Sequence, residues 1–457
     1  MKTYSEDGRN YLQELAVLAK ANNKIAPELY QKYSVKRGLR NEDGSGVLVG
    51  LTELGDVHGY IFDEGEKVPD EGRLTYRGLK ISELVSGILR ENRFGFEETC
   101  YFLLFGSLPD QEQLKRFNSL LGEKRELPAG FTENMILKAP STNIMNKLAR
   151  SVLVCYSYDA NPDDIAVENV LRQCIELIAR FPTMAAYGYQ AKSHYHLGES
   201  LYIHKPRKDL STAENLLHMI RPDSKYTATE ARVLDLCLVL HAEHSGGNNS
   251  AFTLHVVSSS DTDTYSAVAA GVGSLKGPKH GGANIKVIEM MEDIKANVRN
   301  WVDEEEVKSY LARILKGEAG DRSGLIYGVG HAVYTLSDPR ALLLKGQAEA
   351  LAEEKSRKDE FALYTQVEKL APAVFREVSG SDKAISANVD LYSGFVYSLL
   401  NIPLDLYTPI FAIARIAGWS AHRLEEIISG GRIIRPAYKN VSPLQEYTPL
   451  QKRRSSQ

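Results

Sequence analysis

Four short segments concentrate side chains that can move protons, and each interrupts an otherwise helical pattern with glycine, asparagine or aspartate. They are HAEHSGGNNS at 241–250, GPKHGGAN at 277–284, YGVGHAVYTLSDPR at 327–340 and SANVDLYSG at 386–394. A neutral imidazole can donate or accept a hydrogen bond, and a carboxylate can accept a proton. The segments therefore predict acid–base chemistry, carried by their histidines and by Asp390.

His280 lies between a proline and two glycines, directly before a segment with helical periodicity. The free N–H groups and positive dipole of a helix start disfavour an imidazolium, so we expect His280 to be neutral and able to donate a hydrogen bond. The paired glycines would let a ligand approach the backbone closely. His331 also follows glycines. Taken alone, each residue could instead be a structural histidine that hydrogen-bonds its own loop.

Asp390, as a single residue before an apolar turn, could be the N-cap of a helix. Arg340, Arg415 and Arg435, each taken alone, would belong to surface ion pairs. The chain has 55 basic and 59 acidic residues and a net charge of −4, which gives no overall attraction to nucleic acid or membrane. An anionic ligand would therefore need a local basic cluster, which these arginines could supply.

The spacing of His241 and His244 could suit a metal ion, but the HExxH pattern of zinc proteases and the PCxxC of zinc deaminases are absent. The glycine-rich GVGSLKG at 271–277 lacks the GK[ST] ending of a phosphate loop. We therefore predict neither a metal site nor a resident cofactor.

The four cysteines lie far apart and form no CxxC pair, which argues against a zinc ribbon or a disulfide scaffold. The amino terminus carries acidic residues where a signal peptide would need a basic start and an apolar run. The expected location is the cytoplasm, without a membrane partner.

Helical periodicity covers most of the chain and would position these segments. A capping box from Thr227 to Glu230 opens one helix and should direct His241 inward. Further helices are expected over 163–181, 283–301, 303–315, 340–354 and 360–378. Strand signals are confined to Val47–Tyr76, so the protein should be mainly helical with a minor hairpin near the amino terminus.

The four segments resemble, in order and spacing, the motifs of the citrate synthase family. The upstream VPDEGRLTYRGL is similar to the family's early turn motif, and IARIAGWSAHRLEEIISGGRIIRP to its closing arginine pair. The resemblance runs from about Gly46 to Pro436. It implies an acyltransferase that condenses acetyl-CoA with oxaloacetate and water to citrate and CoA, through an enol and citryl-CoA.

The resemblance also implies a role for each matching residue. Asp390 would take a methyl proton from acetyl-CoA, His280 would donate a hydrogen bond to the thioester oxygen, and His331 would polarise the oxaloacetate ketone. The residues expected to hold oxaloacetate or citrate are His244, Arg340, Arg415 and, from the partner subunit, Arg435. Those expected against the CoA adenine are Ile326, Tyr327, Gly328, Val329 and Gly330.

These roles agree with the chemistry of the side chains. An aspartate of ordinary pKa cannot deprotonate a thioester methyl group unless the developing oxyanion is stabilised at the same moment. Arginines grip carboxylates with two hydrogen bonds, which suits citrate. The chain departs from the family pattern in HAEHS for HADHE, in Lys279 for an apolar residue and in Thr335 for a basic one. Thr335 puts a CoA phosphate contact at that position in doubt.

The implied fold is all-α, with a large domain of 1–278 and 387–457 and a small domain of 279–386 inserted in it. The site would lie between the domains of a homodimer subunit, so that domain closure excludes water. One alternative is 2-methylcitrate synthase, which uses propionyl-CoA, because one methylene changes affinity by only about 1 to 3 kcal/mol. The other is a non-catalytic relative that binds carboxylates, which the histidines and Asp390 disfavour.

Overall fold

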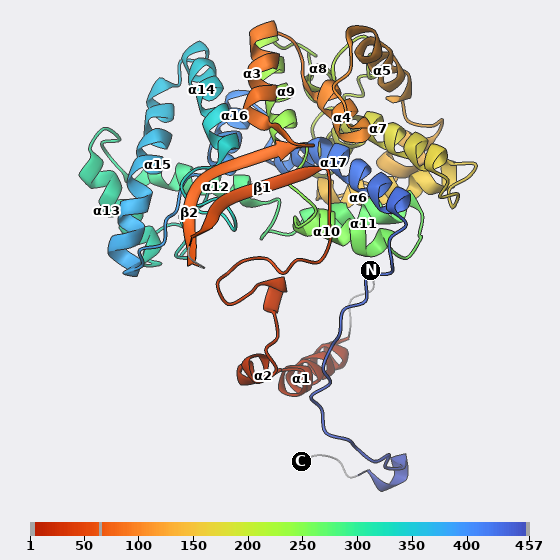
Figure 1. Cartoon of the computed structure of the whole chain (residues 1–457), viewed down its shortest axis with the longest axis vertical. Helices are drawn as coiled ribbons and strands as arrows, with labels where there is room; N and C mark the ends of the chain where they lie inside the picture. Colours follow the sequence, from red (N-terminus) through yellow and green to blue (C-terminus); the bar gives the residue numbers. More distant parts are fainter. Residues whose placement is uncertain (1–4, 64–65, 454–457) are drawn as a thin grey trace.

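The computed structural model describes residues 5–63 and 66–453, and helices make up most of this part of the chain (Figure 1). The described strands are β1 (Gly55–Asp63), β2 (Glu66–Tyr76) and β3 (Leu79–Lys80), in an antiparallel sheet of order β1-β2-β3. The register pairs Gly55 with Tyr76 and shifts between His58 and Tyr60. The predicted fold class, all-α with a minor hairpin near the amino terminus, is confirmed, although residues 47–54 form no strand.

Helices α13 (Glu304–Leu315), α14 (Pro339–Glu354) and α15 (Lys358–Ser379) lie to the left of the hairpin in Figure 1, in the smaller half of the body. Helix α16 (Val389–Leu399) packs against both α12 (Ala283–Asn297) and α14. Helix α13 packs against α15. His280 lies in the loop before α12, His331 in the loop before α14, and Asp390 in the first turn of α16.

The larger half lies on the other side of Figure 1. It comprises α4 (Phe96–Phe105), α5 (Gln111–Lys124), the π-helical turn Thr132–Leu137, α6 (Ile144–Cys155), α7 (Val167–Leu197), α8 (Thr212–Ile220), α10 (Asn249–Ser258) and α11 (Thr264–Leu275). Short 3-10 turns lie at Arg37–Leu39, Tyr156–Tyr158, Leu404–Leu406 and Leu450–Lys452.

Helix α17 (Tyr407–Ser429) joins the two halves through the middle of the molecule. Every residue from Tyr407 to Leu424 is buried, and the helix packs against α4, α7, α9 (Ala228–His241) and α10. Helix α3 (Ile81–Glu91) follows the sheet and contacts α9 and α14. Because α9 and α17 lead directly into or contain candidate site residues, the core itself fixes part of the site.

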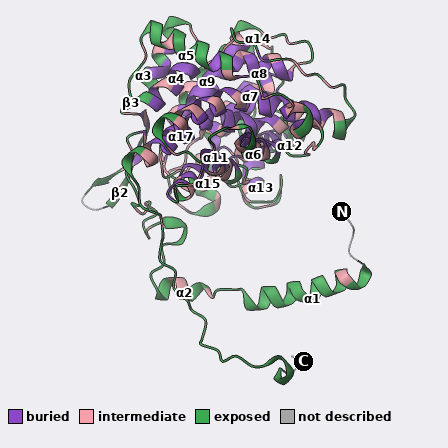
Figure 2. Cartoon of the chain, turned by 90° about the vertical axis from the view of Figure 1, so that its right-hand side faces the viewer, coloured by how far each residue is buried: buried purple, intermediate pink, exposed green. Residues whose placement is uncertain are grey.

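The described segments nearest to the two ends, residues 5–32 and 430–453, extend away from the body (Figure 2). Helices α1 (Glu6–Asn22) and α2 (Pro27–Lys32) contain no buried residue, and residues 430–453 form an exposed segment. Within the described residues, no helix is long and apolar enough to cross a membrane.

Most predicted helices are confirmed with boundaries within a few residues. The capping box of Thr227 and Glu230 opens α9, and His241 is buried at its end. The helix expected over 163–181 is wrong at both ends, since α7 begins at Val167 and continues to Leu197. It passes through Pro182 because residues on both sides of the proline are buried, and this packing outweighs one lost backbone hydrogen bond.

Candidate active site

The loop before His331 is paired with the segment before Asp390. Val329 forms an antiparallel bridge with Ala387, and the Gly330 N–H donates to the Ser386 carbonyl at 2.7 Å. The Asn388 N–H donates to the Gly328 carbonyl at 2.8 Å, and its side chain donates to Gly330. Two segments nearly sixty residues apart therefore hold their candidate side chains as one unit.

Asp390 lies in the first turn of α16, but it does not cap the helix. The N-cap is Asn388, whose side-chain oxygen accepts from the Asp390 N–H at 2.9 Å. The alternative reading of Asp390 as an N-cap is therefore wrong. Burial raises the pKa of Asp390 to about 6, against the opposing effect of the Arg340 charge. The carboxylate is thus a stronger base than an exposed aspartate.

His331 is neutral, and the structure fixes which ring nitrogen carries its hydrogen. Its Nδ1 accepts from the N–H groups of Val333 at 3.0 Å and Tyr334 at 3.2 Å. A nitrogen that accepts two N–H groups has no hydrogen of its own, so Nε2 is the donor. Burial and the Arg340 charge lower the pKa of His331 to about 4. The residue can therefore polarise a carbonyl at neutral pH.

Arg340 is buried, which excludes the surface ion pair that the residue suggests when it is taken alone. The Asp338 carboxylate holds it with two hydrogen bonds, from Nε at 3.0 Å and from Nη2 at 2.8 Å. Burial disfavours the charge on Arg340, but Asp338 raises its pKa above the usual range. Asp338 also accepts from the Val389 N–H at 3.1 Å, so it ties the start of α14 to the start of α16.

Arg415 is buried in the middle of α17, again in contrast to a surface ion pair. Its Nε donates to the His241 carbonyl at 2.8 Å, while Nη1 and Nη2 are buried without a hydrogen-bond partner among the described residues. Burial lowers its pKa to about 10, so the guanidinium stays charged at neutral pH. A buried cation with two unpaired donors is what a carboxylate ligand requires.

His280 lies two residues before Gly282, the N-cap of α12, as the sequence predicts. Its Nε2 contacts the Asn248 Oδ1 at 3.1 Å and the Ser250 Oγ at 3.2 Å, so it is held by the start of α10 rather than by its own loop. Burial, with a contribution from Arg415, lowers the pKa of His280 to about 4. The ring is neutral, as expected, although burial contributes more than the sequence reasoning assumed.

His244 is buried directly after α9, and its Nε2 has no partner among the described residues. Its ring lies 5.3 Å from that of His331 and 5.7 Å from that of Tyr334, centroid to centroid. Burial and the charge of Arg340 lower its pKa well below the usual range. His244 is thus a third neutral imidazole beside the same cations.

These six residues form one electrostatic unit, which we call the central cluster. Its members are His244, His280, His331, Arg340, Asp390 and Arg415. The Arg340 charge acts on Asp390 and His331, and the Arg415 charge acts on His280. Both arginines act on His244. Two cations, three neutral donors and one weakly acidic carboxyl could bind an anionic substrate and move a proton within it.

Arg435 is not part of the central cluster of its own chain. It lies exposed on the C-terminal segment, next to Ile434, whose N–H donates to the Ser259 Oγ at 3.0 Å. The predicted origin of Arg435 from a partner subunit remains a prediction.

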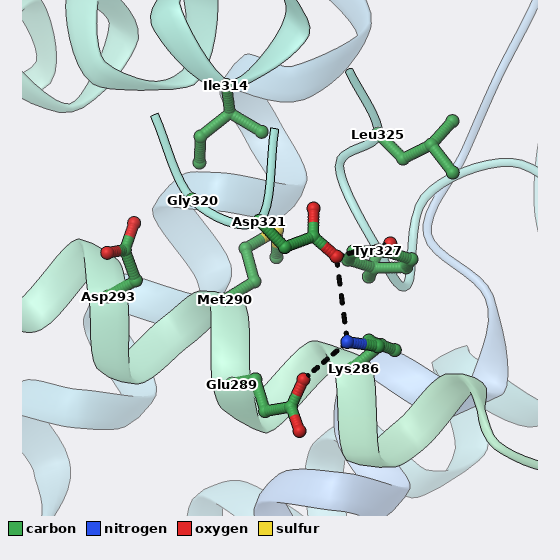
Figure 3. A pocket seen from close by; sticks show the side chains of 9 residues that line it. All are labelled: Lys286, Glu289, Met290, Asp293, Ile314, Gly320, Asp321, Leu325 and Tyr327. Carbon is green, nitrogen blue, oxygen red and sulfur yellow. Dashed lines mark hydrogen bonds and ion pairs between the residues drawn. The ribbon is translucent and has the colours of Figure 1, made fainter. Parts of the chain in front are cut away.

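The segment expected against CoA adjoins a cavity of about 210 Å³ (Figure 3). Tyr327 lines this cavity, and Lys286 of α12 forms ion pairs there with Glu289 and Asp321. Gly328 has φ +80°, and a side chain there would meet Leu391 of α16. The remaining lining residues are Met290, Asp293, Ile314, Gly320 and Leu325.

The sequence patterns do not single out two further residues of the site, Asp338 and Tyr334. Asp338 is the N-cap of α14 and precedes Pro339, and an Asp-Pro pair at a helix start is a pattern that indicates an N-cap. Tyr334 packs 4.6 Å from the His331 ring, and its buried hydroxyl has no partner among the described residues. Nothing in the sequence distinguishes Tyr334 from other tyrosines of the chain.

Comparison with known proteins places this arrangement in a family. A family model described as "Citrate synthase, C-terminal domain" matches residues 43–437. A citrate synthase of Synechocystis is 34% identical over 80% of this chain and 84% of its own. The 2-methylcitrate synthase 1 of Corynebacterium glutamicum is 32% identical over 84% and 94%. The crystal structure of a Pyrobaculum aerophilum citrate synthase superimposes with a TM-score of 0.74 at 29% identity, covering 90% of this chain and 94% of that one.

Proposed function

The chain belongs to the citrate synthase family, and we propose that its central cluster performs the family's reaction, the condensation of acetyl-CoA with oxaloacetate and water to citrate and CoA. The observation that carries the proposal is Asp390, a carboxylate of raised pKa among three neutral imidazoles and two buried arginines. This set supplies a base, hydrogen-bond donors and carboxylate-binding groups together.

Asp390 removes a proton from the acetyl methyl group, and its raised pKa reduces the difference in acidity that opposes this transfer. His280 stabilises the oxygen of the developing enol. The Asn248 Oδ1 only accepts; it accepts from the Ser250 hydroxyl at 2.8 Å and lies 3.1 Å from the His280 Nε2, so in this structure the ring hydrogen is on Nε2. For Nδ1 to donate to the enol oxygen, the Ser250 hydroxyl turns from Asn248 toward Nε2, 3.2 Å away, and the ring takes its other neutral tautomer. The neutral ring then donates without adding a charge.

Oxaloacetate, with its two carboxylates, is held by Arg340, Arg415 and His244. The Arg415 Nη1 and Nη2 and the His244 Nε2 have no partner among the described residues, and Arg340 adds a second buried positive charge. The His331 Nε2–H donates to the ketone oxygen and so polarises the carbonyl group whose carbon the enol attacks. The new C–C bond gives citryl-CoA, which water hydrolyses to citrate and CoA. Proton removal, enol stabilisation and ketone polarisation are assigned to the chain's own side chains, so the proposal includes no resident metal or cofactor.

We assign acetyl-CoA to the loop formed by Ile326, Tyr327, Gly328, Val329 and Gly330. The cavity beside Tyr327 supports this placement, since it adjoins the loop that precedes His331. The four buried free cysteines fit a reducing compartment, which supports the cytoplasm as the location.

We further propose that the working molecule is a homodimer in which Arg435 completes the partner's site. The large and small domains, 1–278 with 387–457 and 279–386, would close around the substrates; residues 1–4, 64–65 and 454–457 lie outside the described part. The exposed position of Arg435 on an extended segment supports a role in a neighbouring subunit.

The experiment that tests the proposal follows thiol release from acyl-CoA in the presence of oxaloacetate. We expect acetyl-CoA to be the better substrate by kcat/KM. A preference for propionyl-CoA would instead identify a 2-methylcitrate synthase, the alternative favoured by the similarity to the Corynebacterium enzyme. No thiol release with either substrate would overturn the proposed function.

A further inference from the structure

Four side chains that the mechanism does not use form a continuous series of hydrogen bonds, which we call the hydrogen-bond chain. The Nδ1 of His255 is 2.9 Å from the Glu426 Oε2, and its Nε2 is 3.0 Å from the Nδ1 of His422. The Nε2 of His422 is 2.9 Å from the Glu243 Oε1. The order is therefore Glu426, His255, His422, Glu243, from the end of α17 to the segment after α9.

The number of hydrogens constrains the charge of this hydrogen-bond chain. Two neutral imidazoles carry one N–H each, but the chain contains three contacts that each require a hydrogen. With both glutamates ionised, and therefore only accepting, one imidazole must carry the extra hydrogen and be cationic. Both rings have a neighbour on each side, but His422 is fully buried and has two carboxylates beside it, Glu243 at 2.9 Å and Glu425 at 3.8 Å. Their effect outweighs burial and raises the pKa of His422 to about 9, whereas burial and His422 lower the pKa of His255.

The Glu243 end of the hydrogen-bond chain packs against α17 one turn after Arg415, where a Cβ added to Gly418 would overlap the Glu243 carboxylate. Glu243 lies between His241 and His244 in the sequence and is fully buried. Burial lowers the pKa of Arg415, and among the charged groups the Glu243 carboxylate opposes this effect most strongly. Yet the terminal nitrogens of Arg415 form no hydrogen bond to Glu243 or to any other described residue. Among the described residues, His422 is the one side chain that forms a hydrogen bond with the Glu243 carboxylate.

We propose that His422, as an imidazolium, is a positioning residue that holds Glu243 away from Arg415 and so keeps that guanidinium free for a substrate carboxylate. Without the His422 charge, the buried Glu243 would lack its cation and would pair with Arg415 instead. A carboxylate of the substrate would then have to displace a carboxylate of the protein. The proposal rests on the proposed role of Arg415 in binding oxaloacetate.

A metal ion is the competing occupant, because His255, His422 and Glu425 bring ligand atoms within 4.8 Å of one another. The facing ring nitrogens are 3.0 Å apart, which is the spacing of an N–H···N hydrogen bond. Two nitrogens on one tetrahedral zinc ion, each bonded at about 2.0–2.1 Å, would lie further apart than this. The geometry therefore favours a proton between the rings.

The test compares His422→Gln with the control His255→Gln in the full-length enzyme. Glutamine at 422 still offers Glu243 an amide hydrogen but carries no charge, so a purely structural role would be rescued. We expect its KM for oxaloacetate to rise at least about tenfold, with kcat changed less than about threefold. His255→Gln keeps an acceptor for His422 and a donor for Glu426, and should remain close to the wild type in both constants.

Nitrogen NMR of the histidine-labelled enzyme gives an independent readout. Both ring nitrogens of His422 should be protonated at pH 7.5, whereas His255 should carry one hydrogen. A neutral His422, a wild-type KM in His422→Gln, or a metal ion found at the site by elemental analysis would each overturn the inference.

Arg415→Met separates this inference from the proposed function. If Arg415→Met raises the KM for oxaloacetate and His422→Gln does not, the positioning role alone is wrong. If neither variant changes KM, the assignment of Arg415 to oxaloacetate is wrong as well.

Discussion

At the residue scale, the two buried arginines differ in how far the protein itself satisfies them. Arg340 is held by Asp338 through two hydrogen bonds, while Arg415 keeps two terminal nitrogens without a partner in the described structure. An unpaired buried donor costs about 1 to 3 kcal/mol, and more when the group is charged. Asp338 therefore holds Arg340 in position. The unpaired Arg415 nitrogens lower the stability of the fold but remain available to bind a ligand.

Asp390→Asn tests the proposed base. Asparagine keeps the size and polarity of the side chain but cannot accept the methyl proton. We expect steady-state kcat to fall at least about a hundredfold, the usual scale of a positioned general base, while oxaloacetate binding measured by calorimetry is retained. Turnover near that of the wild type would show that another group removes the proton.

The same variant should stabilise the fold, which separates a catalytic loss from unfolding. The pKa of Asp390 is about 6 in the folded protein and near 3.8 when exposed, so above pH 6 the folded state holds a charge that burial disfavours. Removing the charge should add about 1 to 3 kcal/mol to the free energy of unfolding at pH 7.5. This gain in stability should disappear as the pH falls through 6 toward 4. Urea unfolding of the wild type and the variant at pH 7.5 and at pH 4 would measure it.

The sequence predicted the types of the site residues better than their surroundings. The neutral state of His280 was expected from its position before a helix, but burial turned out to be the largest cause. Burial of Arg340 and Arg415 could not be read from either residue alone, because it depends on helices distant in the chain. The sequence alone is compatible with Asp390 as an N-cap or as a base, and the structure excludes the first role because Asn388 caps the helix.

At the element scale, backbone pairing between 328–330 and 386–388 places His331 and Asp390 beside each other. This pairing requires Gly328 to approach α16 closely, at a φ of +80° that side chains rarely adopt. Gly330 has a similar φ of +91°, but an added Cβ there would meet nothing within 4 Å. A side chain at either position would therefore bear backbone strain, but only a side chain at position 328 would also overlap its neighbours.

Gly328→Ala and Gly330→Ala form a matched pair. Both variants bear the strain of a positive φ, about 1 to 2 kcal/mol. Only Gly328→Ala adds contacts of 2.9 Å to Val287 and 3.0 Å to Leu391. We expect urea unfolding to show a further loss of about 1 to 3 kcal/mol for Gly328→Ala. Equal losses in the two variants would mean that the loop moves away from α16 without cost.

Helical periodicity was sufficient to predict most elements but not the length of α7. Pro182 follows the last apolar residue of the expected helix, so a stop at Phe181 was the natural reading. The helix continues because Met184, Ala185 and Ala186 are fully buried. Tertiary burial of this kind leaves no local signal before the proline.

At the scale of the whole molecule, the central cluster draws on both predicted domains. His331 and Arg340 come from the predicted small domain, and His244 and Arg415 from the large one. A ligand that contacts both groups binds the closed state better than the open one and shifts the population toward it. We expect small-angle scattering to give a smaller radius of gyration with saturating oxaloacetate. An unchanged radius would argue against a hinge between these segments.

The final prediction concerns the extended carboxyl-terminal segment. Helix α17 ends at Ser429, the left-handed conformation of its C-cap Gly430 turns the chain, and Arg435 follows in an exposed segment. If Arg435 serves the partner's site, each site of a symmetric dimer combines His280 of one chain with Arg435 of the other. His280→Ala and Arg435→Ala homodimers should then both be severely impaired in thiol release.

Dimers formed by co-expressing the two variants distinguish a shared site from a site within one chain. With shared sites, a mixed dimer has one site with both defects and one site with neither. Random assortment makes about half of the dimers mixed, so the preparation should recover about a quarter of the wild-type activity. If Arg435 served its own chain, every site in the mixture would carry one defect and no activity would return. Separating mixed dimers by two affinity tags would raise the expected recovery to about half, because one of their two sites is intact.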